Sequence, residues 1–99
     1  MVVVLPRELT IAQAAALQAA LRPALEEGAE VLLDGTAVDE VDVAGLQVLC
    51  AAGRTALERG AHLAFASRGC SRPLADAIAL AGLGHDEADR WLIREVDRG

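Results

Sequence analysis

Four carboxylates lie within nine residues of one another, at Asp34, Asp39, Glu40 and Asp42. Carboxylates that follow a strand of a parallel sheet can bind Mg²⁺ or accept a phosphoryl group. A phosphoacceptor pocket also uses a lysine, and the chain contains none. The alternative interpretation is a solvated loop, in which one aspartate ends a strand and another begins a helix. The missing lysine favours the loop.

The other reactive side chains lack the partners that catalysis or metal binding needs. Cys70 is flanked by arginines that lower a thiol pKa, but the sequence offers no base for it. His62 and His85 have no second ligand at the spacing of a metal site. We therefore expect no enzyme activity, no metal and no cofactor. The competing hypothesis is an enzyme or phosphoacceptor that uses Asp34, Asp42 or Cys70.

Length and composition limit the function classes. The 99 residues predict a single domain over 1–99, and 54% of them are hydrophobic, so one core is possible. The net charge of −6 and only two aromatic residues argue against nucleic-acid binding. Apolar runs are too short for a membrane span, and the apolar start is too short for a signal peptide. A cytoplasmic protein is expected.

Apolar runs and helix signals alternate along the chain. β-Branched or continuous apolar runs predict strands over 2–5, 31–33 and 62–66. A capping box formed by Thr10 and Gln13 starts the first predicted helix, Pro23 kinks or ends its regular part, and Gly28 follows it. Further helices are predicted from Asp42 to Gly60 and from Pro73 to Gly82, and Ser67–Arg72 is expected to be a loop.

This order predicts an α/β fold. Right-handed β-α-β-α-β-α connections give a small, mainly parallel or mixed sheet with helices packed alongside. The expected buried stripes include Ile11 and Leu17 on the first helix and Leu46, Leu49, Cys50, Gly53 and Leu57 on the second. Residues 86–96 fit either an edge strand or a last helix. Gly45 lowers helix stability, so another backbone must approach it, either within the chain or from a partner.

Two runs, Val31–Val38 and Val41–Leu46, together resemble the STAS domain family of bacterial anti-sigma factor antagonists and related regulatory modules. The run Val31–Val38 is similar to the family's strand and its aspartate turn. The run Val41–Leu46 is similar to the signature Asp-(Ser/Thr)-(Ser/Ala)-Gly-Leu that opens the second helix. Helix endings at Arg59-Gly60 and Ala81-Gly82-Leu83 also agree, and the order of elements matches from Leu5 to Leu83.

Two departures from the family pattern bear on function. Kinase-switched antagonists carry a phosphorylated Ser or Thr where this chain has Val43, and the next residue is Ala44, so phosphorylation at the family position is not expected. Thr10 replaces an acid often found at the start of the first helix. The resemblance implies partner-binding residues, which we call the candidate contact residues: Thr10, Asp34, Thr36, Asp42, Val43, Ala44, Gly45 and Gln47.

The resemblance implies a non-enzymatic, constitutive protein-interaction module with no cofactor. Its expected partner is an anti-sigma factor or serine kinase-like protein, without nucleic-acid binding or membrane insertion, and a homodimer is possible. The alternatives are a STAS-type small subunit of a transporter or chemotaxis-linked assembly, and a domain that senses a small ligand such as a nucleotide or lipid. Mass spectrometry for phosphorylation or thiol modification would detect the competing enzyme class.

Overall fold

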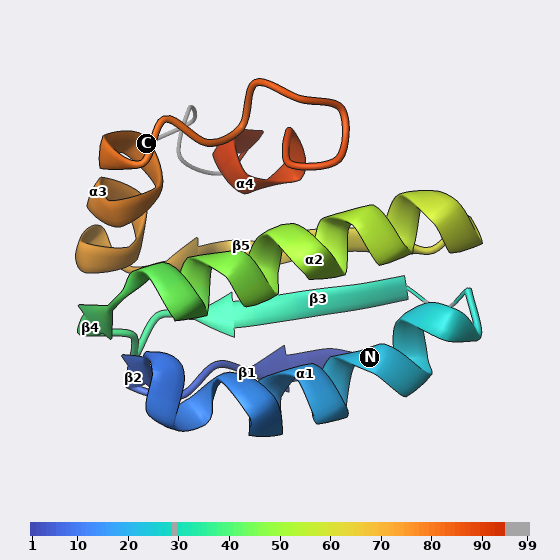
Figure 1. Cartoon of the computed structure of the whole chain (residues 1–99), viewed down its shortest axis with the longest axis horizontal. Helices are drawn as coiled ribbons and strands as arrows, with labels where there is room; N and C mark the ends of the chain where they lie inside the picture. The colour runs from blue at the N-terminus through green and yellow to red at the C-terminus, as the bar shows by residue number, and fades with distance from the viewer. Residues whose placement is uncertain (29, 95–99) are drawn as a thin grey trace.

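Three apolar segments form the central sheet of the computed structural model, which describes residues 1–28 and 30–94. All pairs are parallel, and the strand order is β1-β3-β5 (Figure 1). In the central strand every second residue is buried, and Val31 and Leu33 are fully inaccessible. The burial alternates because successive side chains of a strand point to opposite faces of the sheet. The predicted α/β class is therefore confirmed, with strands at Val2–Val4 (β1), Glu30–Gly35 (β3) and His62–Cys70 (β5).

Two long helices cover one face of this sheet and run side by side in the same direction (Figure 1). They are α1 (Ile11–Glu26) and α2 (Val43–Arg59). Aliphatic side chains of both helices join those of the sheet in one core. The helix α1 continues past Pro23 to Glu26, so of the two predicted effects of Pro23, a kink or an end of the helix, the end is wrong. Leu57 is 52% exposed, since Ala52 and Ala56 take the buried positions of α2 instead.

A second, very short sheet was not predicted. It pairs β2 (Glu8–Leu9) with β4 (Glu40–Val41) in parallel, at the end of the molecule where α1 and α2 begin (Figure 1). Strands of two residues give too little periodicity for a sequence pattern to reveal them. This pair fixes the starts of the two helices relative to each other.

The C-terminal third adds two shorter helices, α3 (Arg72–Leu80) and α4 (Trp91–Arg94). Ser71 begins α3 by accepting the Leu74 N–H at 3.2 Å, while its hydroxyl donates to Val38 O at 2.6 Å. The expected loop Ser67–Arg72 is wrong, since β5 continues to Cys70 across a register irregularity. In the ambiguous tail 86–96, residues 86–90 form a bend and turns and Trp91–Arg94 form a short helix, while positions 95 and 96 lie outside the described residues.

The turn before α4, at Ala88, and the Trp91 side chain of α4 lie against α2 where Gly53 leaves space. A Cβ at Gly53 would lie 2.2 Å from Ala88 O and 2.5 Å from Trp91 Nε1. The Trp91 ring also lies 5.1 Å from the Phe65 ring, between centroids. Within the described part of the chain, no helix is long and apolar enough to cross a membrane.

Candidate functional site

The site is built from two strand-to-helix junctions that lie in parallel register. Glu8 pairs with Glu40 and Leu9 with Val41, and each strand enters its helix after a single intervening residue. The two segments therefore present equivalent positions at the same level. Glu-Leu-Thr-Ile leads into α1 and Glu-Val-Asp-Val leads into α2.

Asp42 joins the two helix starts. Its Oδ1 accepts a hydrogen bond from Gly45 N at 2.9 Å, and its Oδ2 accepts one from Ile11 N at 3.0 Å. These N–H groups, that of Gly45 first, lower the pKa of Asp42 below its ordinary value. The predicted N-cap role of Asp42 is confirmed.

The predicted capping box at Thr10 is wrong. Thr10 occupies the N-cap position of α1, but its side chain makes no cap hydrogen bond. Instead, the first N–H of α1 bonds to the Asp42 carboxylate, and Gln13 N donates to the Thr10 carbonyl at 2.9 Å. A charged acceptor forms a stronger hydrogen bond than a hydroxyl, and an adjacent parallel junction can supply it.

Exposed aliphatic side chains begin both helices. Val43 is 69% exposed and Ile11 is 75% exposed. The expectation that Ile11 belongs to the buried stripe is therefore wrong. The buried side chains of α1 begin only at Leu17, in the second turn of the helix. One feature of the sequence could have indicated that Ile11 and Val43 occupy equivalent positions. Ile11 lies three residues after Glu8, as Val43 lies three residues after Glu40.

Gly45 serves a contact within the chain. A Cβ at this position would lie 2.0 Å from Leu9 O and 2.6 Å from Leu9 C. The close backbone approach predicted from this glycine is thus made by the β2–α1 junction, and Gly45 is buried. Among the candidate contact residues, Gly45 therefore packs beneath the surface, against Leu9, and is not itself exposed.

Two other acidic residues of the segment, Asp34 and Asp39, are held in separate interactions. Asp34 Oδ1 accepts from the Thr36 hydroxyl at 2.7 Å and from Thr36 N at 3.0 Å, and these bonds lower the pKa of Asp34. Asp39 pairs with Arg7 at 2.6 Å. In the described ranges 1–28 and 30–94, no group of three His, Cys, Asp or Glu side chains is placed to hold a metal ion.

An open groove lies over α1 and α2 next to these helix starts. It encloses about 630 Å³, and its lining residues are Ala14, Gln18, Ala44, Gln47, Val48, Cys50, Ala51 and Arg54. Ala44 and Gln47 thus border the groove, and Gln47 is exposed. Deeper between the helices, a cavity of about 40 Å³ touches Leu21, Leu25 and Ala52. That volume is well below the several hundred Å³ of ordinary ligand sites.

The two cysteines are reduced and only partly accessible. Burial, followed by the charge of Asp89, raises the pKa of the Cys50 thiol, which disfavours the reactive thiolate. Cys70 lies at the end of β5 and not in a loop as expected.

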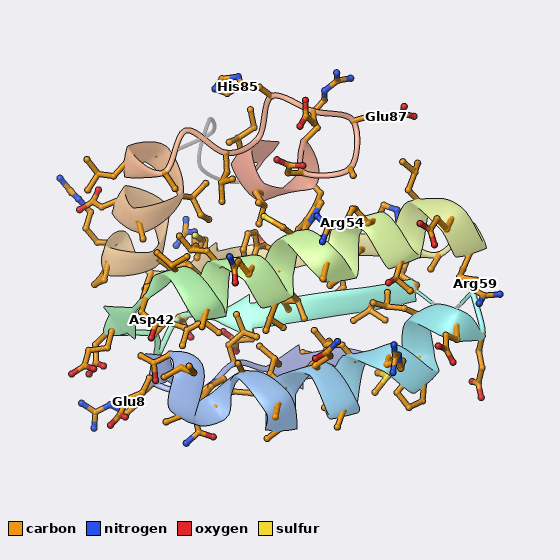
Figure 2. The ribbon with its side chains drawn as sticks, viewed as in Figure 1. Glu8, Asp42, Arg54, Arg59, His85 and Glu87 are labelled. Carbon is orange, nitrogen blue, oxygen red and sulfur yellow. The ribbon has the colours of Figure 1, made fainter. Side chains whose placement is uncertain are left out.

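Figure 2 shows Glu8 and Asp42 at one end of the molecule and Arg59 at the opposite end. The helix starts therefore form a distinct end surface. We call Ile11, Val43, Ala44 and Gln47 the helix-start surface: two exposed aliphatic side chains with a small and a polar neighbour.

The comparisons with known proteins agree with this geometry. A family model described as "Mlab, STAS domain" matches residues 1–94. No curated protein and no solved structure matches the chain significantly. STAS domains are in general non-enzymatic modules for protein interaction and regulation. With nearly the whole length matched, and with parallel strands and helices in the expected order, the chain belongs to the STAS domain family.

Proposed function

We propose that this chain is a non-enzymatic interaction module that resembles an anti-sigma factor antagonist and binds a protein partner through the helix-start surface. Unlike a kinase-switched antagonist, it would bind constitutively. The observation that supports this proposal is the 69% exposure of Val43 at the family's phosphorylation position. Asp34, Thr36 and Thr10 are proposed as further contacts at its border. Asp42 and Gly45 hold the surface in place by the contacts described above.

Residue chemistry explains why such binding would be constitutive. A phosphoserine adds nearly two negative charges, and burying them against the apolar part of a partner surface would cost much desolvation free energy. Valine has no hydroxyl to modify and contributes apolar area at the same position. A partner that fits Val43 and Ile11 therefore meets the same surface at all times.

The proposed partner is an anti-sigma factor or serine kinase-like protein in the cytoplasm. A second candidate is a STAS-type small subunit of a transporter or chemotaxis-linked assembly. The same exposed valine favours it, because a subunit of a standing complex needs a permanent contact and no switch. Stoichiometric copurification with membrane components would indicate the second role, and copurification with a soluble kinase-like protein would indicate the first.

A small-ligand sensor has less support. The cavity between α1 and α2 is only about 40 Å³ and has room for water molecules. The larger space of about 630 Å³ has the volume of a ligand site, but it is an open surface groove and would not bury most of a ligand. Thermal-shift measurements with nucleotides and lipids test this function, since a bound ligand raises the unfolding temperature.

The test of the main proposal compares Val43→Glu with Leu57→Glu in quantitative affinity purification from the native host. Both changes place a carboxylate at an exposed aliphatic position of α2, and the two positions are about 21 Å apart along the helix. We expect Val43→Glu to lose a protein that wild type and Leu57→Glu both retain, by tenfold or more. Circular dichroism confirms that both variants are folded. Equal recovery of every bound protein by the two variants would refute the proposed surface.

A further inference from the structure

The helix-start surface has a charged border whose chemistry indicates what kind of partner fits it. We infer that the partner presents an apolar contact bordered by a pair of Arg or Lys side chains, which Glu8 and Glu40 bind while Ile11 and Val43 fill the apolar part. This inference rests on the proposed docking function and adds the chemical character of the partner.

The parallel junctions place both pairs of side chains. Glu8 and Glu40 are register partners on adjacent strands, so their backbones are about 4.8 Å apart. Three residues further along each segment come Ile11 and Val43, which the Asp42 carboxylate connects through the Ile11 N–H. Three residues extend by at most about 10 Å. The Cα atoms of each glutamate and of the aliphatic residue that follows it therefore lie within about 10 Å of each other.

Neither glutamate forms an ion pair within the described ranges. Both are exposed, and the ion pairs found in residues 1–28 and 30–94 use other acids: Arg7–Asp39, Arg22–Glu26 and Arg72–Asp76. Arg7, which precedes Glu8 in the sequence, directs both its Nε and its Nη2 to Asp39 Oδ2, and the charge of Glu8 acts on it less than Asp39 does. Glu8 and Glu40 thus keep their charge available to another molecule.

The pairing of like charges carries a cost within the chain. Two carboxylates on directly opposed strand positions repel each other, and a two-residue strand pair has few other interactions to offset that repulsion. A cation from a partner relieves this repulsion at the moment of binding. Its attraction also acts at a distance, so it accelerates association in dilute salt.

The apolar pair decides between a protein and a simple ion as the occupant. Two opposed glutamates without a third ligand make a poor metal site, since Ca²⁺ takes six to eight oxygens. A guanidinium or ammonium group on a protein surface satisfies a carboxylate with one or two hydrogen bonds and leaves its neighbours free to cover Ile11 and Val43. The combination fits an amphipathic protein segment with positive charge.

The probe for this inference is a phage-displayed library of random 12-residue peptides, selected on the full chain. Selection on wild type is expected to enrich peptides in which aliphatic or aromatic residues are flanked by Arg or Lys. Selection on Glu8→Gln/Glu40→Gln is expected to keep the apolar residues and lose the Arg and Lys enrichment. Individual peptides from the wild-type selection should bind this variant about three- to tenfold more weakly in 50 mM salt, and the difference should shrink in 500 mM salt.

The matched control is Glu27→Gln/Glu58→Gln, which removes the same charge from exposed positions away from the helix starts. It is expected to behave as wild type. Equal Arg and Lys enrichment on all three proteins would mean attraction to net charge alone and would overturn the inference, as would enrichment of acidic or uncharged peptides. Selected peptides that bind Val43→Glu as well as wild type would overturn the proposed function itself. The two failures are therefore distinguishable.

Discussion

Asp42 has a structural role that its place in the family signature does not reveal. One carboxylate accepts from the first turn of α2 and from the first N–H of α1, which is 31 residues away in sequence. Negative charge is favoured at both helix N-termini because the helix dipoles point their positive ends there. The residue that follows the caps in each helix, Ile11 or Val43, is thereby held at a fixed position.

The charge of Asp42 makes acid sensitivity a residue-level prediction. Its pKa is lowered in the folded chain relative to the ordinary 3.8, chiefly by Gly45 N–H and then by Ile11 N–H. Its contribution to stability is therefore present above the ordinary value and is lost as the pH falls through the folded pKa. In urea unfolding from about pH 6 to about pH 2.5, Asp42→Asn should lose less stability than wild type, while part of the loss remains because Asp34 shifts in the same direction.

Glu27→Gln, at an exposed position in the turn after α1, serves as the control and should follow the wild-type pH dependence. If Asp42→Asn has the same pH dependence as wild type, the carboxylate does not connect the helices in solution. The measurement is the free energy of unfolding at each pH.

At the scale of elements, the contact of α4 with α2 depends on the absence of one side chain. Gly53→Ala would place a Cβ 2.2 Å from Ala88 O, against backbone that cannot rotate away. We expect the segment with Trp91 to shift outward, although alanine favours the helix by about 1 kcal/mol. Trp91 is the single tryptophan, so its fluorescence reports on this contact alone. Its emission should move to longer wavelength while the circular dichroism keeps the helical signal of α1 and α2.

The control for Gly53→Ala is Ala51→Gly, which lowers helix propensity nearby without adding bulk. Its tryptophan emission is expected to match that of wild type. An unshifted emission in folded Gly53→Ala would show that α4 does not pack on this glycine.

The sequence predicts an element when its hydrophobic pattern spans several residues and its end signals lie within the same segment. Asp42 begins a helix as expected, because an N-cap acts within three residues. Ile11, β2 and β4 escape prediction because their environment comes from a segment about 30 residues away. Gly45 signals a close approach from sequence alone, but only the fold identifies Leu9 as the neighbour. The Val43 position follows from the family motif, whereas its exposure follows from the packing of α2.

At the scale of the whole molecule, the packed layers form the core, and the ends of the layers form the candidate binding surface. One sheet face and two parallel helices form the core, and both helices begin at the same end. Because α1, α2 and α3 each follow a strand, these helices begin at the carboxyl ends of strands. A surface made of helix starts is therefore a consequence of the topology, and its chemistry depends on the few residues at the junctions.

This arrangement also predicts where the fold opens last. The strand β3 pairs on both sides, and its residues Val31 and Leu33 are fully buried, whereas β1 is an edge strand of three residues with Val2 and Val4 exposed. Amides that open only on global unfolding exchange slowest. In hydrogen exchange followed by NMR, the amides of Val31 and Leu33 should be protected at least tenfold longer than the amide of Val3, whose strand pairs with β3 at the edge of the sheet. Protection of Val3 equal to that of Leu33 would mean that the edge strand unfolds only with the whole sheet, and that the chain has a single cooperative unit up to its edge.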